Sequence, residues 1–298
     1  MGILFDMNRR RFLVLLGGGA SAAALWPSSS VEITRTGHAL GAKVSLTVTH
    51  SSASRADAAI DAAFAELDLV EDVMSLYRPH SQLCALNRDG VLHDPHPYLE
   101  TVIRHAVDLS RASNGAFDVT VQPIWEKRSV DLVDWRGIGL ATGRIALRSG
   151  QAVTLNGIAQ GFALDRVTAV LRDHGVREAL LDTGELGAIG RARTVGIQHP
   201  SQPDACIDLA SLEGRCMATS GNYATRDHIV EPRTGRAPDH FLGVTVVAST
   251  GMEADGLSTA CFVLDLEPAL ELVASRCAEA LFVTKEGRVK ATGGFPRV

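Results

Sequence analysis

The segment Leu155-Asn-Gly-Ile-Ala-Gln-Gly-Phe-Ala-Leu-Asp165 places two glycines between an extended stretch and a helical pattern. Residues 151–155 (Gln-Ala-Val-Thr-Leu) are mostly apolar or β-branched, which predicts a strand leading into Gly157. The residues that follow predict a helix over 162–173. The apolar residues of that helix fall on one face: Ala163, Val167, Val170 and Leu171. The segment therefore predicts a strand, a glycine-bounded turn and a helix.

The turn between these two elements is suited to an anion. Free N–H groups at a helix N-terminus favour negative charge, so a phosphate group can lie against the backbone there. The glycine spacing differs from the G-x-G-x-x-G pattern of dinucleotide-binding folds and from that of the P-loop. The segment alone therefore predicts an anion-binding turn and does not identify the ligand.

The rest of the chain alternates strands and helices without a regular order. Apolar periodicity predicts strands at 43–49, 178–181 and 244–248, and helices at 53–74, 98–113, 254–264 and 268–277. Because this order is irregular and the last strands look antiparallel, the pattern favours an α+β fold over a doubly wound parallel sheet. Residues 31–298 contain no repeat or linker, so we expect one domain with mixed or antiparallel sheets and packed helices.

Composition excludes several classes of protein. The chain has 298 residues, of which 46% are apolar and 21% charged, enough to bury a large core and too apolar for a disordered chain. With 29 basic and 34 acidic residues its net charge is −5, so it lacks the basic surface that grips nucleic acids. Its five cysteines are scattered and indicate neither a disulfide framework nor a zinc site. We therefore expect a globular protein without a nucleic-acid partner.

Residues 1–30 have the pattern of an export signal. Basic residues precede a short apolar run that ends in small residues, and the sequence Asn8-Arg9-Arg10-Arg11-Phe12-Leu13, in which paired arginines are followed by Phe-Leu, resembles a bacterial twin-arginine signal. The run is shorter than the roughly 20 apolar residues that span a bilayer. An uncleaved anchor and a buried N-terminal helix are the alternatives. We expect residues 31–298, with 26 basic and 33 acidic residues and a net charge of −7, to act in the periplasm, in solution or at the outer face of the inner membrane.

Two polar segments lie in the first half of the chain. Met74-Ser-Leu-Tyr-Arg-Pro79 ends the helix predicted at 53–74 and presents one tyrosine and one arginine in a loop. Asp118 lies within Gly115–Pro123, where a carboxylate either caps a turn or takes part in chemistry. Taken alone, each segment is also compatible with a purely structural role.

A third polar region spans Ala218-Thr-Ser-Gly221 and residues 227–235. It brings hydroxyls, His228 and Arg233 within eighteen residues of one another. These groups can hold a phosphate and move a proton. Arg233 pairs with a phosphate or closes a salt bridge that braces the loop, and both roles stay open.

Asp255 and Thr259 lie four residues apart in the helix predicted at 254–264. Residues at this spacing share one helical face, so their oxygens point the same way. A carboxylate and a hydroxyl are ligands that suit Mg²⁺, which completes its shell with water and substrate phosphate. The alternative is an aspartate near a helix N-terminus with a threonine that faces solvent.

Taken together, these segments resemble the FAD:protein FMN transferase family, also called the ApbE family. The resemblance runs in order over about residues 38–290 and rests on six motifs that occur jointly. They are Met74-Ser-x-Tyr-Arg-Pro79, Gly115-x-Phe-Asp-x-Thr-x-x-Pro123, Gly157-Ile-Ala-x-Gly-x-Ala-x-Asp165, Ala218-Thr-Ser-Gly221, His228-Ile-x-x-Pro-Arg-Thr-Gly235 and Ala254-Asp-x-x-Ser-Thr-Ala260.

The resemblance implies an α+β fold with FAD in a cleft and one or two Mg²⁺ ions. It implies transfer of FMN from FAD to a Ser or Thr hydroxyl of another protein, expected to be a membrane redox flavoprotein, with a phosphoester formed and AMP released. Asp255, Thr259 and the Ala159 carbonyl would bind the metal, and His228 and Asp255 would be catalytic. The flavin or adenine pocket would be lined by Met74, Ser75, Tyr77, Asp118, Gly157, Gln160, Gly161, Asp165 and Thr219.

The sequence departs from the family pattern at four places. Glu231 replaces an aspartate, and Leu40-Gly41-Ala42 stands where Met-Gly-Thr is common. Gln160 stands where the family usually has lysine, and Gly184-Glu185-Leu186 stands where Gly-Gly-Asn is usual. His228 has an ordinary pKa near neutrality, which suits a general base or a donor to developing charge. Two other functions stay open: a Mg²⁺-dependent FAD pyrophosphatase that uses water, and a flavin-binding or delivery protein without catalysis.

Overall fold

The computed structural model describes residues 30–222 and 228–298, and residues 1–29 of the predicted export signal lie outside that part. Its largest element is an eight-stranded sheet in the order β1-β2-β6-β7-β10-β11-β12-β13, with every neighbouring pair antiparallel. The strands are β1 (Val31–Ala39), β2 (Ala42–His50), β6 (Glu178–Asp182), β7 (Leu186–Ile189), β10 (Cys216–Ser220), β11 (Phe241–Ala248), β12 (Glu279–Thr284) and β13 (Val289–Ala291).

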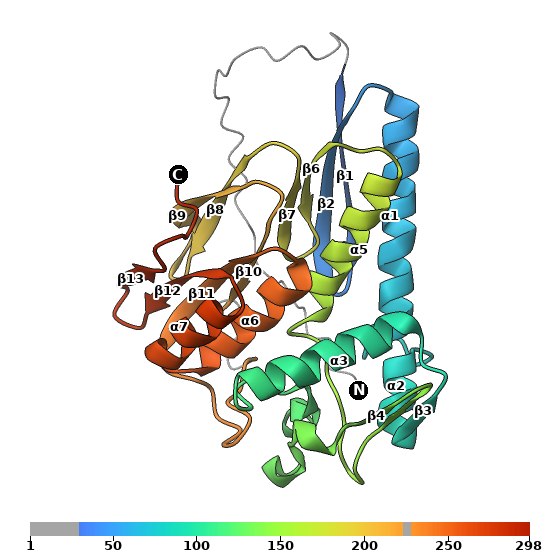
Figure 1. The fold of residues 1–298 in the computed structure, drawn as a ribbon, viewed down its shortest axis with the longest axis vertical. Coiled ribbons are helices and arrows are strands. Elements are labelled where there is room, and N and C mark those ends of the chain that lie inside the picture. Colours follow the sequence, from blue (N-terminus) through green and yellow to red (C-terminus); the bar gives the residue numbers. More distant parts are fainter. Residues whose placement is uncertain (1–29, 223–227) are drawn as a thin grey trace.

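Helices cover one face of this sheet (Figure 1). α1, α5 and α6 lie side by side on it, and α3 crosses near their lower ends. Along β2, Val44, Leu46 and Val48 are fully buried, whereas the residues between them are partly or wholly exposed, because successive side chains point to opposite faces. These side chains join the apolar faces of the helices in the main core. The helices are α1 (Ala53–Met74), α3 (Pro97–Ala112), α5 (Ala159–Asp173), α6 (Gly251–Val263) and α7 (Leu266–Ser275).

A two-stranded ribbon covers part of the opposite face. It pairs β8 (Arg193–His199) with β9 (Gln202–Leu212) in antiparallel register. β10 is buried on both faces for this reason: Cys216 and Ala218 belong to the main core, whereas Met217 belongs to a second core shared with the ribbon. The sheet is thus enclosed between a helical layer and a smaller β layer.

A smaller group of elements lies beyond the end of α1, in the lower part of Figure 1. It includes a three-stranded antiparallel sheet in the order β3-β5-β4. The elements of this group are α2 (Gln82–Asp89), β3 (Val91–His93), α4 (Gln122–Trp125), β4 (Gly139–Ala141), β5 (Arg144–Ala146) and short 3₁₀ turns at Val119–Val121, Val130–Leu132 and Trp135–Gly137.

The structure confirms the predicted α+β class and the single domain, and its sheets are antiparallel. The helix predicted at 53–74 matches α1 at both ends, and the other four predicted helices lie within three residues of α3, α5, α6 and α7. The strands predicted at 43–49, 178–181 and 244–248 correspond to β2, β6 and β11. Within residues 30–222 and 228–298, no helix is both long and apolar enough to cross a membrane.

The strand predicted at 151–155 is wrong, although all five residues are buried. The Asn87 side chain of α2 takes the place of a neighbouring strand, since its amide accepts from the Val153 N–H (2.7 Å) and donates to the Val153 carbonyl (2.8 Å). The Thr154 N–H donates to the Val119 carbonyl (2.8 Å). Because these partners satisfy the buried backbone, no strand ladder is needed.

Two glycines allow α5 and α6 to touch backbone to backbone. A Cβ on Gly161 or on Gly251 would overlap the carbonyl oxygen of the other glycine. Asp165 of α5 accepts from the N–H groups of Gly251 (2.6 Å) and Met252 (2.9 Å), and Asp255 of α6 accepts from the Gly161 N–H (3.0 Å). Each carboxylate therefore caps the positive N-terminal end of the other helix. We call this arrangement the reciprocal cap.

We predict that Gly161→Ala lowers the free energy of unfolding by about 2 kcal/mol or more, because the new methyl group meets a backbone oxygen that cannot rotate away. Urea unfolding followed by circular dichroism measures this change. Gly293→Ala is the matched control, since no atom lies within 4 Å of its added Cβ, and its effect should stay within about 0.5 kcal/mol. Equal effects of the two substitutions would contradict the close approach of α5 and α6.

Candidate active site

A cavity lies where the N-terminus of α5 meets α6, the end of β10 and the segments 116–121 and 228–232. Its empty volume is about 960 Å³, which includes solvent at its mouth. The lining is partly apolar, with Phe117, Val119, Trp125 and Val230, and partly polar. Six of the thirteen residues predicted for the site line it: Asp118, Gly157, Gln160, His228, Asp255 and Thr259.

Asp255 and Thr259 reach this cavity from α6, as their four-residue spacing predicts. Asp255 is only 4% exposed, and its Oδ2 is oriented by the Gly161 N–H. The Thr259 Oγ1 lies 3.2 Å from the Ser220 Oγ on β10. Gly157 leaves room for the Thr259 side chain, because a Cβ at position 157 would lie 3.0 Å from the Thr259 Oγ1. One carboxylate and two hydroxyls are thereby gathered at one place.

These oxygens fit a magnesium ion by their chemistry. Mg²⁺ prefers hard oxygen ligands and is commonly held by one or two carboxylates, with water and substrate phosphate completing its shell. Among the described residues, no group of three or more His, Cys, Asp or Glu side chains could hold a metal. A cation beside Asp255 and Thr259 would therefore depend on hydroxyls, water and substrate. Ala159 begins α5 but is not part of the cavity lining, so the role of its carbonyl stays a prediction.

His228 lines the cavity from the segment between β10 and β11. The neighbouring backbone is held by Asn222, which accepts from the Ile229 N–H (3.1 Å) and donates to the Ile229 carbonyl (3.4 Å). Arg233 donates to the Asn114 carbonyl (2.6 Å) just beyond the end of α3. This hydrogen bond braces the loop, whereas the salt bridge predicted for Arg233 is absent among the described residues, and its pairing with a phosphate stays a prediction.

Asp118 both lines the cavity and caps a turn. Its Oδ1 accepts from the N–H (2.8 Å) and the hydroxyl (2.6 Å) of Thr120, and its Oδ2 accepts from the Trp135 N–H (3.0 Å). Burial raises the pKa of Asp118, and these three hydrogen bonds partly offset that rise. The carboxylate therefore fixes the cavity wall whether or not it contacts a ligand.

Two of the departures from the family pattern, Gln160 and Gly184-Glu185, meet in the cavity lining. Gln160 and Glu185 both line it, and a Cβ on Gly184 would lie 2.6 Å from the Gln160 Nε2. Glu185 is 2% exposed, and its Oε2 accepts from the Thr219 N–H (3.3 Å). A buried carboxylate thus lies beside the position where a lysine is usual in the family.

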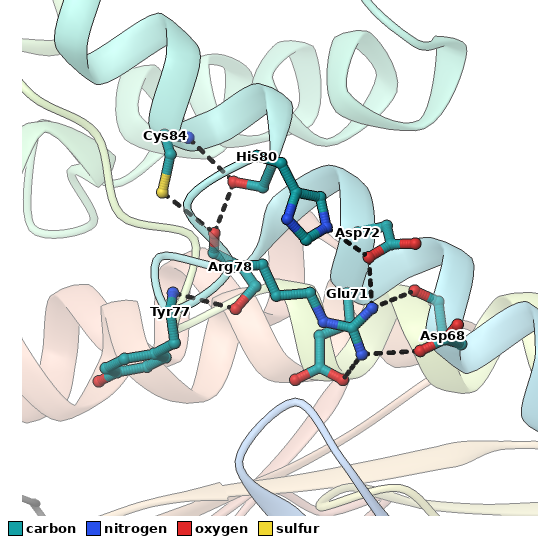
Figure 2. A network of polar contacts seen from close by, with 9 residues as sticks. Asp68, Glu71, Asp72, Tyr77, Arg78, His80 and Cys84 are labelled. Atoms are coloured by element: carbon teal, nitrogen blue, oxygen red, sulfur yellow. Dashed lines mark hydrogen bonds and ion pairs between the residues drawn. The ribbon is translucent and has the colours of Figure 1, made fainter.

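The predicted residues Met74, Ser75 and Tyr77 lie at the end of α1 and are not part of the cavity lining. Ser75 ends the helix, and its Oγ accepts from the Tyr77 N–H (3.1 Å), while the Tyr77 ring is 69% exposed. Figure 2 shows the ring on the far side of this turn from the Arg78 guanidinium. Their contact with a flavin stays a prediction.

Arg78 fastens this turn to α1 (Figure 2). Its guanidinium pairs with Asp68 (2.7 Å), Glu71 (2.8 Å) and Asp72. Three carboxylates near a helix C-terminus are unfavourable, because that end carries partial negative charge. The carboxylates raise the pKa of Arg78, and the cation in turn compensates their charge. Arg78 therefore fixes the backbone that presents Tyr77.

Three further residues predicted for the site do not line the cavity. Each of them contacts another part of the fold. Gly161 and Asp165 belong to the reciprocal cap. Burial raises the pKa of Asp165, and the amides that it caps partly offset the rise. The Thr219 Oγ1 lies 2.9 Å from the Thr245 Oγ1 of β11. A ligand role for these three residues is untested.

Ser220, rather than Thr219, lines the cavity, and the site prediction omitted it. Successive side chains of a strand point to opposite faces, so Ala218 and Ser220 face α6 while Thr219 faces away. This alternation was available in the sequence. Trp125 and Glu185 were also omitted, and no local pattern places Trp125 of α4 beside residues of α6.

Asp182, at the end of β6, supports the cavity wall at Gly184. Its Oδ1 accepts from the Gly184 N–H (3.0 Å), and burial raises the pKa of Asp182 to about 6. Between about pH 4 and pH 6 the folded chain keeps a proton that the unfolded chain releases, so this group lowers stability as the pH rises through that window.

We therefore predict that Asp182→Asn raises the free energy of unfolding at pH 7.5 by about 1 to 2 kcal/mol, with little gain at pH 4. The asparagine oxygen still accepts from Gly184. Thermal unfolding across this pH range measures the effect. Asp204→Asn, at an exposed position of β9, is the control and should leave the profile unchanged. A gain that is equal at both pH values would contradict the assignment.

Comparisons with known proteins agree with this geometry. The family model described as "ApbE family" matches residues 40–282. An FAD:protein FMN transferase of Klebsiella pneumoniae is 25% identical over 92% of this chain and 90% of its own length, and one of Haemophilus influenzae is 30% identical over 67% and 70%. The crystal structure of Pseudomonas stutzeri flavinyl transferase ApbE has a TM-score of 0.79 at 24% identity, over 90% of this chain and 97% of that one. The chain belongs to the ApbE family.

Proposed function

We propose that this protein transfers the FMN half of FAD to a Ser or Thr hydroxyl of an acceptor protein, with Mg²⁺ as cofactor. The observation that carries the proposal is the convergence of His228, Asp255 and Thr259 on one cavity. Relatives that cover most of this chain are named for transfer of FMN from FAD to protein, which supports the same activity here.

The cavity offers groups that suit the isoalloxazine ring and the diphosphate of FAD. An isoalloxazine ring is flat and largely apolar, and Phe117, Val119 and Val121 offer apolar contact. A diphosphate is strongly anionic and needs a cation beside it, because the Asp255 carboxylate already caps the N-terminal end of α5. Asp255 and Thr259 would hold the cation. A bound Mg²⁺ would neutralise charge on the phosphate that is transferred and on the AMP that leaves.

In the transfer step the acceptor oxygen bonds to the FMN phosphorus. The bond from that phosphorus to the bridging oxygen breaks, so AMP leaves with the bridging oxygen and a phosphoester remains on the acceptor. The hydroxyl proton must be removed as the bond forms. His228 can take it, since an imidazole titrates near neutral pH. Apolar side chains in the lining exclude water that would otherwise compete with the acceptor.

We predict that Asp255→Asn lowers FMN transfer by about 100-fold or more, because a neutral amide is a much poorer ligand for Mg²⁺. The asparagine oxygen still accepts from the Gly161 N–H, so the fold should persist. The assay supplies FAD, Mg²⁺ and short synthetic peptides with a central Thr, and mass spectrometry detects FMN-peptide. Asp61→Asn, on the outer surface of α1, is the matched control.

Three outcomes of this assay bear on the proposal. FMN-peptide formed by the parent chain and lost in Asp255→Asn supports it. Release of FMN and AMP at the same rate with and without peptide would contradict transfer and indicate a pyrophosphatase. Tight FAD binding without any product would indicate a flavin carrier.

The proposed place of action is the periplasm, and the proposed acceptor is a membrane redox flavoprotein. The support is the sequence of residues 1–30, with Arg10 and Arg11 ahead of an apolar run. A twin-arginine signal is read by a receptor, and lysine does not replace the pair well. We predict that replacement of Arg9, Arg10 and Arg11 together by lysine leaves the chain in the cytoplasm, as measured by immunoblotting of cell fractions. Unchanged export would contradict this route.

A further inference from the structure

A second depression in the surface adjoins the mouth of the cavity. It shares the lining residues Trp125 and Val230 with the cavity, so the two spaces lie next to each other. We call it the mouth groove. Its lining residues are Ile124, Trp125, Val230, Gly235, Arg236 and Ala237.

Hydrogen bonds preform one wall of the mouth groove. The turn at 231–236 is closed by the Gly235 N–H, which donates to the Glu231 carbonyl (2.8 Å), and by the Glu231 N–H, which donates to the Arg236 carbonyl (2.8 Å). Gly235 has a φ of +67° and packs on α4, since its Cβ position lies 3.6 Å from the Ile124 Cγ2. A wall that is already ordered loses little entropy when a partner binds.

Two side chains of the mouth groove lack common interactions: Trp125 is not fully buried, and Arg236 has no ion pair with a described residue. Trp125 is 44% exposed, although indole is among the most favourable groups to bury at an interface. Arg236 is exposed, and no carboxylate among residues 30–222 and 228–298 lies within ion-pair distance of it. By contrast, Arg128 pairs with Glu126 (2.8 Å), and Arg233 donates to a backbone carbonyl.

The nearest acidic side chain of the same turn does not compensate Arg236. The Glu231 Oε2 accepts from the Thr234 N–H (2.8 Å) and so caps its own turn. The mouth groove therefore combines an apolar surface with one uncompensated positive charge. A polypeptide that carries an apolar side chain and a carboxylate a few residues apart is complementary to it.

We propose that the mouth groove seats the acceptor polypeptide beside its reactive Ser or Thr, with an apolar side chain on Trp125 and a carboxylate paired with Arg236. This inference rests on the proposed transfer of FMN to protein. The hydroxyl must enter the cavity while the chain on either side stays outside, so the flanking residues cross the mouth. The mouth groove adjoins the cavity at Trp125 and Val230, so it lies where these flanking residues can bind.

The test uses a library of short synthetic peptides with a central Thr and randomised flanks. The full chain, FAD and Mg²⁺ are supplied, and the peptides that acquire FMN are sequenced by mass spectrometry. We expect the parent chain to enrich Asp or Glu at one flanking position, and Arg236→Glu to enrich Lys or Arg there. For one acidic peptide, kcat/KM should fall about tenfold in Arg236→Glu and recover in Arg236→Lys.

A matched control and a second variant make the result specific. Arg288→Glu makes the same charge change on an exposed residue of the β12–β13 turn, and it should leave the selection unchanged. Trp125→Ala should raise the KM for peptide about tenfold and weaken the apolar preference. FAD affinity, from flavin fluorescence, should be the same in the parent and Arg236→Glu, which shows that the cavity is intact.

The outcomes separate this inference from the proposed function. FMN-peptides formed without an acidic preference, or with the same preference in Arg236→Glu, would overturn the mouth groove as the acceptor site and leave FMN transfer standing. FMN-peptide absent from the parent chain, with FAD bound, would overturn both. A preference that reverses with the charge at position 236 supports the inference.

Discussion

The reciprocal cap between α5 and α6 is the constraint on which the site depends. A buried carboxylate is costly unless hydrogen bonds and positive charge compensate it. Asp165 and Asp255 each receive that compensation from the N-terminal amides of the other's helix. The contact is close because Gly161 and Gly251 have no side chains between the two backbones. Asp255 is therefore held at the cavity by architecture that exists before any ligand binds, a form of preorganisation that lowers the cost of binding.

The polar and the apolar parts of the cavity lining come from different elements of the fold. Asp255 and Thr259 reach the cavity from α6 and Ser220 from β10, whereas the apolar side chains of Phe117 and Trp125 come from the segment after α3 and from α4. Two arginines of the family motifs make bracing contacts, with Arg78 on three carboxylates of α1 and Arg233 on the Asn114 carbonyl. These two arginines fix the position of the backbone. The motifs that contain them therefore include residues with a structural role.

Local patterns in the sequence predicted what depends on local spacing. Asp255 and Thr259 share a helical face because of their four-residue separation, and α1 follows directly from its apolar periodicity. The strand at 151–155 failed because its partner is the side chain of Asn87, more than sixty residues away. The contact of Gly161 with Gly251 could not be predicted either, since no periodicity relates residues of two separate helices. Family resemblance supplied the segments that meet, while the structure supplied their contacts.

Charge balance in the cavity follows from the two departures that meet there. With Gln160 in place of the usual lysine and Glu185 buried nearby, this cavity carries less positive charge at the start of α5 than the family pattern implies. Gln160 can still donate a hydrogen bond, as its contact with the Leu40 carbonyl (3.5 Å) illustrates, but an amide cannot neutralise a phosphate. In the proposed reaction, neutralisation of a diphosphate would then depend mainly on a cation beside Asp255 and Thr259, because the Ala159 and Gly161 N–H groups of α5 already donate to the Leu155 carbonyl (2.8 Å) and to Asp255 (3.0 Å). The reciprocal cap matters for this reason, since it fixes the Asp255 carboxylate at the cavity.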